Sequence, residues 1–417
     1  MHTQSKFRLL VVRLGAMGDI LHALPAVTAL RLAHPGWVID WVVEPRWRAL
    51  LAPEPAIEKL ARAVGPDFSP DIDAAESTPA LAPEVCFSGS SPAIRPFPAI
   101  NEALANQPNP AQPLVNRLHL APTKQWRKAP LSRQTLYEIK ALRRALRAGQ
   151  YDAVLDLQGA IRSAVVGRLA GCRRLIGEAE PRERAARWLF NELVATHGVH
   201  VIEQDVELAS AVAGDDLTPA KPWLPINPSA EAWADEVLPP SAHQPGSPRT
   251  GLRPWGGQNA VLINPGAGWG AKRWPVERYA AVAQGLIDRG LRVLVNAGPG
   301  EEPLAEAISQ ATTGAATPLT CSLEQLIALS RRVALVIAGD TGPLHLACAL
   351  VRPVVGIYGP TDPSRNGPFG TRFKVLRSPE SRRDHARHAA PEAGLLTIQP
   401  EDVLRAADEL LAPEAHS

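Results

Sequence analysis

Two glycine-rich segments in the second half of the chain could hold a phosphate group. Residues 264–275 read NPGAGWGAKRWP, and residues 339–345 read GDTGPLH. Where such a loop opens a helix, free backbone N–H groups and the positive helix end both favour an anion. Lys272 would add a positive charge, and we expect Asp340 to cap a helix that has Pro343 in its first turn. Either loop alone could be structural, but two in one α/β domain favour a nucleotide site.

A third loop, RLGAMGDILH at residues 13–22, could present a carboxylate. Its Gly-x-x-Gly follows an apolar run, but the G-x-G-x-x-G spacing of a dinucleotide site is missing, which argues against a nicotinamide-dependent oxidoreductase. Asp19 has two possible roles. It could cap the first helix, or its carboxylate could stand at the carboxyl ends of the strands, where open α/β sheets bind ligands and a general base would be needed.

A compact basic and aromatic cluster, KQWRK, occupies residues 124–128 and is followed by further cations up to Arg147. Such a run is more often a solvated helix face than a binding site. The whole chain has 44 Lys and Arg against 42 Asp and Glu, a formal net charge of +2. No global field therefore favours nucleic acid, and any attraction to an acidic ligand must be local.

The elements that position these loops alternate between strand and helix patterns. In the first half we expect strands at 9–12, 38–43 and 153–157, with helices at 20–32 and 131–148. In the second half we expect strands at 261–264, 293–296, 334–338 and 354–358, with helices at 276–289, 301–310 and 343–350. The pattern predicts an α/β protein with two doubly wound, Rossmann-like domains that face each other across a cleft.

Two proline-rich segments mark the domain organisation. Periodicity disappears between residues 64 and 122, which we interpret as an insertion, and again between 226 and 258, which we interpret as a linker. The predicted domains are therefore 1–225 and 259–417. A D-x-D pair, Asp71 and Asp73, lies within the insertion and is interpreted as chance, so no metal site is expected.

Cysteine usage and hydropathy bear on the compartment. The four cysteines are far apart and form no C-x-x-C pair, which is typical of a reducing cytoplasm: Cys86, Cys172, Cys321 and Cys348. The apolar stretch near the N-terminus is interrupted by Arg13, Asp19 and His22, and no run of ~18 uncharged apolar residues occurs elsewhere. We expect a soluble or peripheral protein without a transmembrane segment.

Eight sequence blocks, taken in order, resemble glycosyltransferase family 9, the lipopolysaccharide heptosyltransferases, and most closely its heptosyltransferase I branch. The blocks are MGDILH with LPA (17–26), DWVVE (40–44), WRKA (126–129), YDAV (151–154), DLQG (156–159), KRWP (272–275), DTGPLHL (340–346) and YGPTDP (358–363). They span nearly the whole chain apart from the two proline-rich segments.

The resemblance implies a GT-B fold and an inverting, metal-independent transfer of heptose from ADP-heptose to a Kdo residue of lipid A in the inner core. It implies no cofactor beyond the donor substrate, and a cytoplasmic enzyme peripheral at the inner face of the inner membrane. Asp19 matches the catalytic aspartate. The donor contacts carried over by position are Ala267, Gly268, Lys272, Glu302, Cys321, Asp340, Thr341, Gly342 and His345. The acceptor contacts are Lys124, Arg127 and Lys128, with Gln125 where the family has an arginine.

Two alternatives stay open from the sequence. One is the same fold and chemistry with another donor, or with heptosyltransferase II regiochemistry. The other is a nucleotide-sugar-binding protein of envelope assembly that no longer transfers. Because a binding protein needs neither a base nor a phosphate clamp, the presence of both Asp19 and Lys272 favours the enzyme.

Overall fold

The computed structural model describes residues 6–52, 113–239, 259–381 and 389–412. These residues form two compact units, and the chain passes from unit 1 to unit 2 between Pro225 and Ile226. Most of the predicted insertion, with Asp71, Asp73 and Cys86, lies outside the described residues, as does the second half of the predicted linker.

Unit 1 is built on a parallel six-stranded sheet with the order β3-β2-β1-β4-β5-β6. The central strand β1 pairs with β2 on one side and β4 on the other, so that Leu10 lies opposite both Asp40 and Val154. The strands are β1 (Arg8–Val12), β2 (Val38–Val43), β3 (Arg117–Leu120), β4 (Ala153–Asp156), β5 (Leu175–Glu178) and β6 (Glu192–Val194).

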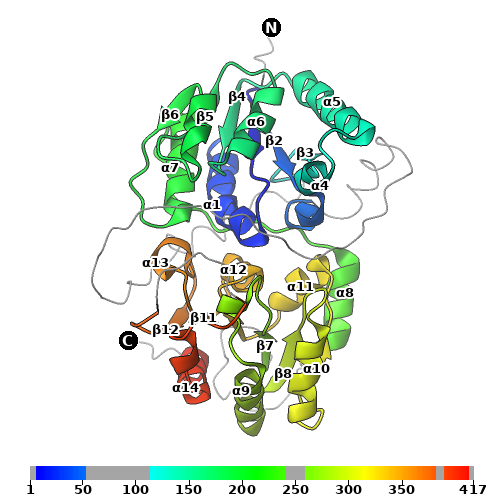
Figure 1. Cartoon of the computed structure of the whole chain (residues 1–417), viewed down its shortest axis with the longest axis vertical. Coiled ribbons are helices and arrows are strands. Elements are labelled where there is room, and N and C mark those ends of the chain that lie inside the picture. Colours follow the sequence, from blue (N-terminus) through cyan, green and yellow to red (C-terminus); the bar gives the residue numbers. More distant parts are fainter. Residues whose placement is uncertain (1–5, 53–112, 240–258, 382–388, 413–417) are drawn as a thin grey trace, which may run out of the picture. The chain divides into compact units, whose positions relative to one another are not determined.

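Helices cover both faces of this sheet (Figure 1). One core contains Leu10, Val12 and Val154 from the strands together with Leu142 and Leu146 from a helix. On the other side α1 packs against α7. The elements are α1 (Met17–Ala33), η1 (Pro45–Leu50), α4 (Thr123–Lys128), α5 (Arg133–Ala148), α6 (Ile161–Leu169), η2 (Arg184–Leu189) and α7 (Val201–Ala213).

Unit 2 repeats the same arrangement with the strand order β12-β11-β10-β7-β8-β9. Its strands are β7 (Ala260–Asn264), β8 (Arg292–Asn296), β9 (Thr317–Leu319), β10 (Leu335–Gly339), β11 (Val354–Tyr358) and β12 (Phe373–Arg377). The helices are α8 (Pro228–Val237), η3 (Gly270–Lys272), α9 (Val276–Asp288), α10 (Glu302–Ala311), α11 (Leu323–Ser330), α12 (Gly342–Ala349), α13 (Pro363–Asn366), η4 (Leu395–Thr397) and α14 (Pro400–Leu411).

Both sheets have the strand order 3-2-1-4-5-6 of Rossmann folds when each unit is counted from its own first strand. In such sheets the connections leave in opposite directions from two adjacent central strands, and ligands bind at the carboxyl ends of those two strands. These switch points lie between β1 and β4 in unit 1 and between β7 and β10 in unit 2.

The predicted central strands are present within two residues of their expected bounds, because continuous apolar runs are buried from both faces. Two details of the sequence interpretation are wrong. β3 lies within the predicted insertion, and α8 lies within the predicted linker. The helix expected at 131–148 is confirmed as α5, which begins where the Ser132 hydroxyl accepts from Thr135 N (3.1 Å).

Tertiary contacts help to explain why these two elements were missed. β3 is only four residues long and is held by pairing with β2, where Val42 lies opposite His119. α8 is capped by Asn227, which accepts from Ala230 N (3.1 Å), and its Glu231 pairs with Arg331 and Arg332 beside α11. Neither feature is visible in local periodicity.

Candidate active site

The switch point of unit 2 holds an ion pair between residues 68 positions apart. Lys272 ends η3 after β7, and Asp340 directly follows β10. Lys272 Nζ donates to Asp340 Oδ2, while His345 Nε2 on α12 lies 3.2 Å from Asp340 Oδ1. All three side chains are largely buried, with exposed fractions of 13%, 9% and 7%. Asp340 thus uses both carboxylate oxygens to orient two potential cations.

The electrostatics of this triad keep Asp340 ionised. Burial alone would raise the pKa of Asp340, but the hydrogen bond with His345 and the charge of Lys272 outweigh it, so the pKa lies well below its usual value. Lys272 Nζ also lies 4.5 Å from the ring centroid of Trp269, a cation–π contact that further restricts it. The result is a fixed positive charge at the carboxyl end of β7.

The first turn of α12 lies beside this charge. The expected N-cap role of Asp340 is wrong: Thr341 is the N-cap, and its hydroxyl donates to Gly339 O (3.2 Å). Asp340 is instead engaged by Lys272 and His345. Pro343 lies in the first turn, as expected, and Gly342 begins the helix. Backbone N–H groups at such a helix start attract anions, so Thr341 and Gly342 stand where a phosphate would be held.

The other predicted donor contacts follow three neighbouring strands at the same edge of the sheet. Ala267 and Gly268 follow β7, Glu302 begins α10 after β8, and Cys321 follows β9. A hydrogen-bond chain joins these strand ends: Asn296 donates to Asn264 Oδ1 (2.9 Å) and accepts from Cys321 N (3.2 Å). Burial raises the pKa of the Cys321 thiol to about 12, so it is present as a neutral thiol.

Glu301, the neighbour of Glu302, packs against the glycine-rich loop at residues 264–275. It was not among the site residues expected from the sequence. A Cβ on Gly266 would lie 1.8 Å from Glu301 Oε2, and backbone amides of Gly298 and Ala267 hydrogen-bond to its carboxylate. Burial raises its pKa. Its only signal in the sequence is its place in the GPGEE run at 298–302. Glu301 explains why residue 266 has no side chain.

The switch point of unit 1 holds Asp19. It is the third residue of α1, and its carboxylate accepts from Ala16 N (3.2 Å). The cap position itself is Ala16, so Asp19 satisfies a helix-end amide while staying partly exposed. A Cβ on Gly15 would lie 2.3 Å from Asp19 Oδ2, and therefore only glycine leaves room for this carboxylate.

The DLQG block after β4 shapes the loop beneath Asp19. Gln158 Oε1 accepts from Leu14 N (2.8 Å) and Gly15 N (2.9 Å). Asp156 Oδ1 in turn accepts from the amides of Gln158 (2.8 Å) and Gly159 (2.9 Å). Burial raises the pKa of Asp156 to about 6, with these hydrogen bonds opposing it. The loops that follow the two strands at the switch point thus hold the segment before Asp19 together.

The basic cluster is larger in three dimensions than in the sequence. Partial burial, then the charges of Arg46, Arg162 and Arg127, lower the pKa of Lys124, and the charge of Glu44 opposes them. Glu44 lies at the centre: its Oε1 accepts from Thr123 Oγ1 and from Lys124 N (3.2 Å). We call Arg46, Lys124, Arg127 and Arg162 the cation cluster.

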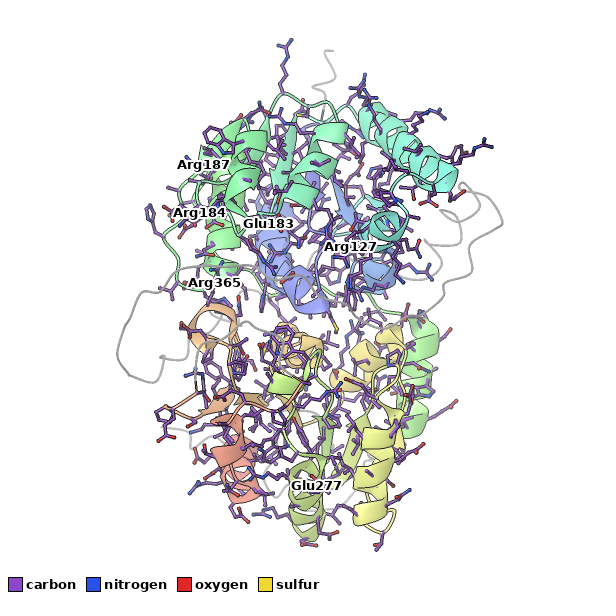
Figure 2. All side chains as sticks on the ribbon, viewed as in Figure 1. Arg127, Glu183, Arg184, Arg187, Glu277 and Arg365 are labelled. Carbon is purple, nitrogen blue, oxygen red and sulfur yellow. The ribbon has the colours of Figure 1, made fainter. Side chains whose placement is uncertain are left out.

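The cation cluster combines residues from η1, α4 and α6, which follow β2, β3 and β4 at the same edge of the sheet as Asp19. Sequence reasoning named Lys124 and Arg127 but missed Arg46 and Arg162, which lie far from residues 124–128 in the sequence. Figure 2 labels Arg127 in unit 1. The third predicted acceptor contact, Lys128, is exposed at the end of α4.

Two further properties concern the described part of the chain. No three His, Cys, Asp or Glu side chains gather there as metal ligands would. None of the helices in the same residues combines the length and apolar character needed to cross a bilayer.

Comparison with known proteins agrees with this geometry. The fold matches solved structures titled "E. coli heptosyltransferase WaaC with ADP" (TM-score 0.66, 24% identity, 97% of this chain and 100% of that chain) and "Structure of E. coli ADP-heptose lps heptosyltransferase II" (TM-score 0.61, 19% identity, 97% and 98%). The two Rossmann-like units therefore form a GT-B fold, the fold class expected from the sequence.

The family follows from the sequence comparisons. Residues 139–394 match the model of "Glycosyltransferase family 9 (heptosyltransferase)", and the chain belongs to this family. It is 28% identical to lipopolysaccharide heptosyltransferase 1 of Escherichia coli K12 over 375 residues, 89% of this chain and 94% of that protein. It is 30% identical to lipooligosaccharide heptosyltransferase 2 of Haemophilus influenzae over 280 residues, 63% and 77% of the two chains. The resemblance noted in the sequence is thereby confirmed.

Proposed function

We propose that this enzyme transfers heptose from ADP-heptose to a Kdo residue of the lipopolysaccharide inner core, with inversion and without a metal ion. One observation carries the proposal. Each Rossmann-like unit has a different charged group at its switch point: the Asp19 carboxylate in unit 1, and Lys272 beside the α12 helix start in unit 2. A carboxylate base and a diphosphate clamp are the two groups that such a transfer needs.

The reaction is a single displacement. The acceptor hydroxyl oxygen forms a bond to the anomeric carbon of heptose, and the bond from that carbon to the diphosphate oxygen breaks. Asp19 accepts the hydroxyl proton as the new bond forms, a contribution of about 10²- to 10⁴-fold. ADP leaves with the bonding electron pair, and its added negative charge is stabilised by Lys272 and the amides at Thr341 and Gly342.

Fixed geometry in unit 2 supports the assignment of the donor. Asp340 pins Lys272 and His345, so the positive charge needs little reorganisation when charge develops on the leaving group. Because these groups supply positive charge, the proposal requires no metal ion. Ala267, Gly268, Glu302 and Cys321, at the same edge of the sheet, are proposed to contact the nucleotide or the sugar.

The acceptor is proposed to bind at the cation cluster together with Lys128. A Kdo residue has a carboxylate and lipid A has phosphates, both of which favour a cluster of Lys and Arg. Since that acceptor is anchored in a bilayer, the enzyme is proposed to act in the cytoplasm, peripheral at the inner face of the inner membrane.

The test is ADP release from ADP-heptose with Kdo₂-lipid A, for the wild type and Asp19→Asn. We expect acceptor-dependent release that the variant loses by at least about 10²-fold, with ADP affinity unchanged. Asp216→Asn, an exposed aspartate of unit 1, is the matched control and should keep its activity.

Two results would decide against the proposal. Full activity of Asp19→Asn would remove Asp19 as the base. Tight ADP binding without any release would favour a nucleotide-sugar-binding protein without transfer. A panel of other nucleotide sugars and of heptosylated acceptors separates a different donor, or heptosyltransferase II regiochemistry, from the proposed reaction.

A further inference from the structure

The outer face of α5 carries a stripe of one charge sign. Facing the core, Thr135, Leu142 and Leu146 are buried, at spacings typical of one helix face. On the opposite face lie Arg133, Tyr137, Lys140 and Arg144, all of them exposed. Their spacing of 4, 3 and 4 residues places them on one side of the helix. Side chains extend from this helix away from unit 1 (Figure 2).

Large apolar side chains accompany these cations. Leu131, in the turn before α5, is 87% exposed, and Tyr137 is 70% exposed. Leu136 beside them is 46% exposed. Exposed apolar groups of this size beside a row of cations mark a contact surface rather than an ordinary solvated face.

Residues 124–148 carry little negative charge of their own. Residues 124–148 contain eight Lys and Arg and one acid, Glu138. Glu138 is engaged by neighbours on α4 and α5: it accepts from Trp126 Nε1 (2.7 Å) and Gln134 Nε2 (2.6 Å). The outer stripe therefore presents positive charge together with Leu131 and Tyr137.

We propose that the α5 surface, defined as Leu131, Arg133, Tyr137, Lys140 and Arg144, docks this enzyme on an anionic lipid bilayer. Cations attract acidic headgroups, while a tyrosine and a leucine enter the interface, a combination that suits membranes better than a purely cationic patch does. The inner face of α5 stays packed in unit 1, so the helix docks by its outer face without unfolding.

The location of this surface gives docking a purpose. α5 begins directly after α4, which holds Arg127 of the cation cluster at the carboxyl edge of the sheet, the edge that also carries Asp19. A bilayer held at the start of α5 would present a lipid-anchored acceptor near that edge. The purpose rests on the proposed function, but the membrane contact itself does not.

Vesicle sedimentation of the full chain tests the contact. The probes are phosphatidylcholine vesicles with and without about one third phosphatidylglycerol, at low and high salt. We expect the wild type to bind the anionic vesicles and to lose most of this binding at high salt. Lys140→Ala/Arg144→Ala should lower the partition coefficient about 25-fold, as expected for two cations near an anionic surface.

A second variant separates the apolar contribution. Leu131→Ser/Tyr137→Ser should lower the partition coefficient about tenfold and keep its salt dependence. The matched control is Arg292→Ala/Arg405→Ala, which removes the same charge from exposed positions of unit 2 and should bind as the wild type does. All three variants should release ADP at the wild-type rate with detergent-dispersed acceptor, so a failure of the transfer reaction is detected separately.

Two outcomes would overturn the proposal. In the first, the wild type does not bind anionic vesicles, or both α5 variants bind as well as the wild type does. In the second, the α5 cations are needed for binding to polyglutamate or RNA but not to vesicles. The partner of the α5 surface would then be an acidic macromolecule and not a membrane.

Discussion

Arg13 and Asp205, separated by 192 positions, form a buried ion pair behind the base of the proposed reaction. Arg13 Nη1 lies 3.8 Å from Asp205 Oδ1 on α7, and the side chains are 7% and 3% exposed. The same guanidinium donates from Nε to the main-chain oxygen of Asp19 (3.0 Å). One buried cation therefore ties the first turn of α1 to α7.

This pair makes stability depend on pH. Burial raises the pKa of Asp205 to about 7, against the opposing charge of Arg13, whereas an unfolded aspartate titrates near ~3.9. Between these values the folded state binds more protons than the unfolded state does, so the stability that Asp205 contributes falls as the pH rises. Asp205→Asn should remove this loss of stability at higher pH.

The measurement is urea unfolding from pH 4 to 8. Relative to the wild type, the free energy of unfolding of Asp205→Asn should rise by roughly 2–4 kcal/mol over this range. The control is Asp216→Asn. Asp216 is exposed and lies shortly after the end of α7, so this variant should follow the wild type. Parallel curves for Asp205→Asn and the wild type would contradict the prediction.

Gly15→Ala should disable the base while leaving the donor site intact. Its Cβ would lie 2.3 Å from Asp19 Oδ2 and must displace that carboxylate. Because misplacing a reacting group by about 1 Å can lower a rate about 10²-fold, we expect a fall of that size in kcat with unchanged ADP affinity. Gly36→Ala, where a Cβ meets no atom within 4 Å, is the control. Normal turnover of Gly15→Ala would mean that Asp19 is not the base.

Lys272→Ala should weaken ADP binding about 10- to 100-fold, as expected for the loss of a charge-assisted contact to a phosphate. Isothermal titration with ADP and with adenosine measures this, and adenosine affinity should hardly change. Arg273→Ala, an exposed neighbour, is the matched control. Equal losses for ADP and adenosine would place Lys272 away from the diphosphate.

Asp340 should stay ionised over the whole working range. Although burial opposes it, the hydrogen bond with His345 and the charge of Lys272 lower the pKa of Asp340 well below that of an ordinary aspartate. The stability from this pair is therefore lost only as the pH falls through that low value. ADP affinity should be measured from pH 5 to 8 for the wild type and for Asp340→Asn. Both should show the same pH dependence, because Asp340 stays ionised throughout this range.

Arg46→Ala and Arg162→Ala should each raise the KM for the acceptor by about three- to tenfold, while the KM for the donor stays constant. Steady-state kinetics with each substrate varied in turn provide the measurement. The control is Arg168→Ala. It removes only an exposed hydrogen bond from Arg168, on α6, to Asn191. A change confined to the donor KM would remove the cation cluster from the acceptor site.

Much of the architecture was predictable from local patterns. Apolar runs such as 38–43 and 354–358 give buried parallel strands, and glycine before Asp19 and before Asp340 marks loops at strand ends. Two of the elements that were missed depend on partners: β3 pairs with the neighbouring β2, and α8 is held by the two arginines beside α11. A local pattern does not contain these partners.

The sequence by itself determined the family, the two Rossmann-like units and the residues that follow each strand, because burial periodicity and loop composition are encoded within a few consecutive residues. Tertiary structure decided which of those residues meet. It joined Lys272 to Asp340, brought Arg46 and Arg162 to Lys124, and placed Arg13 between Asp19 and Asp205. In a parallel sheet the ends of adjacent strands are dozens of residues apart along the chain, so charge pairing across them is set by strand order.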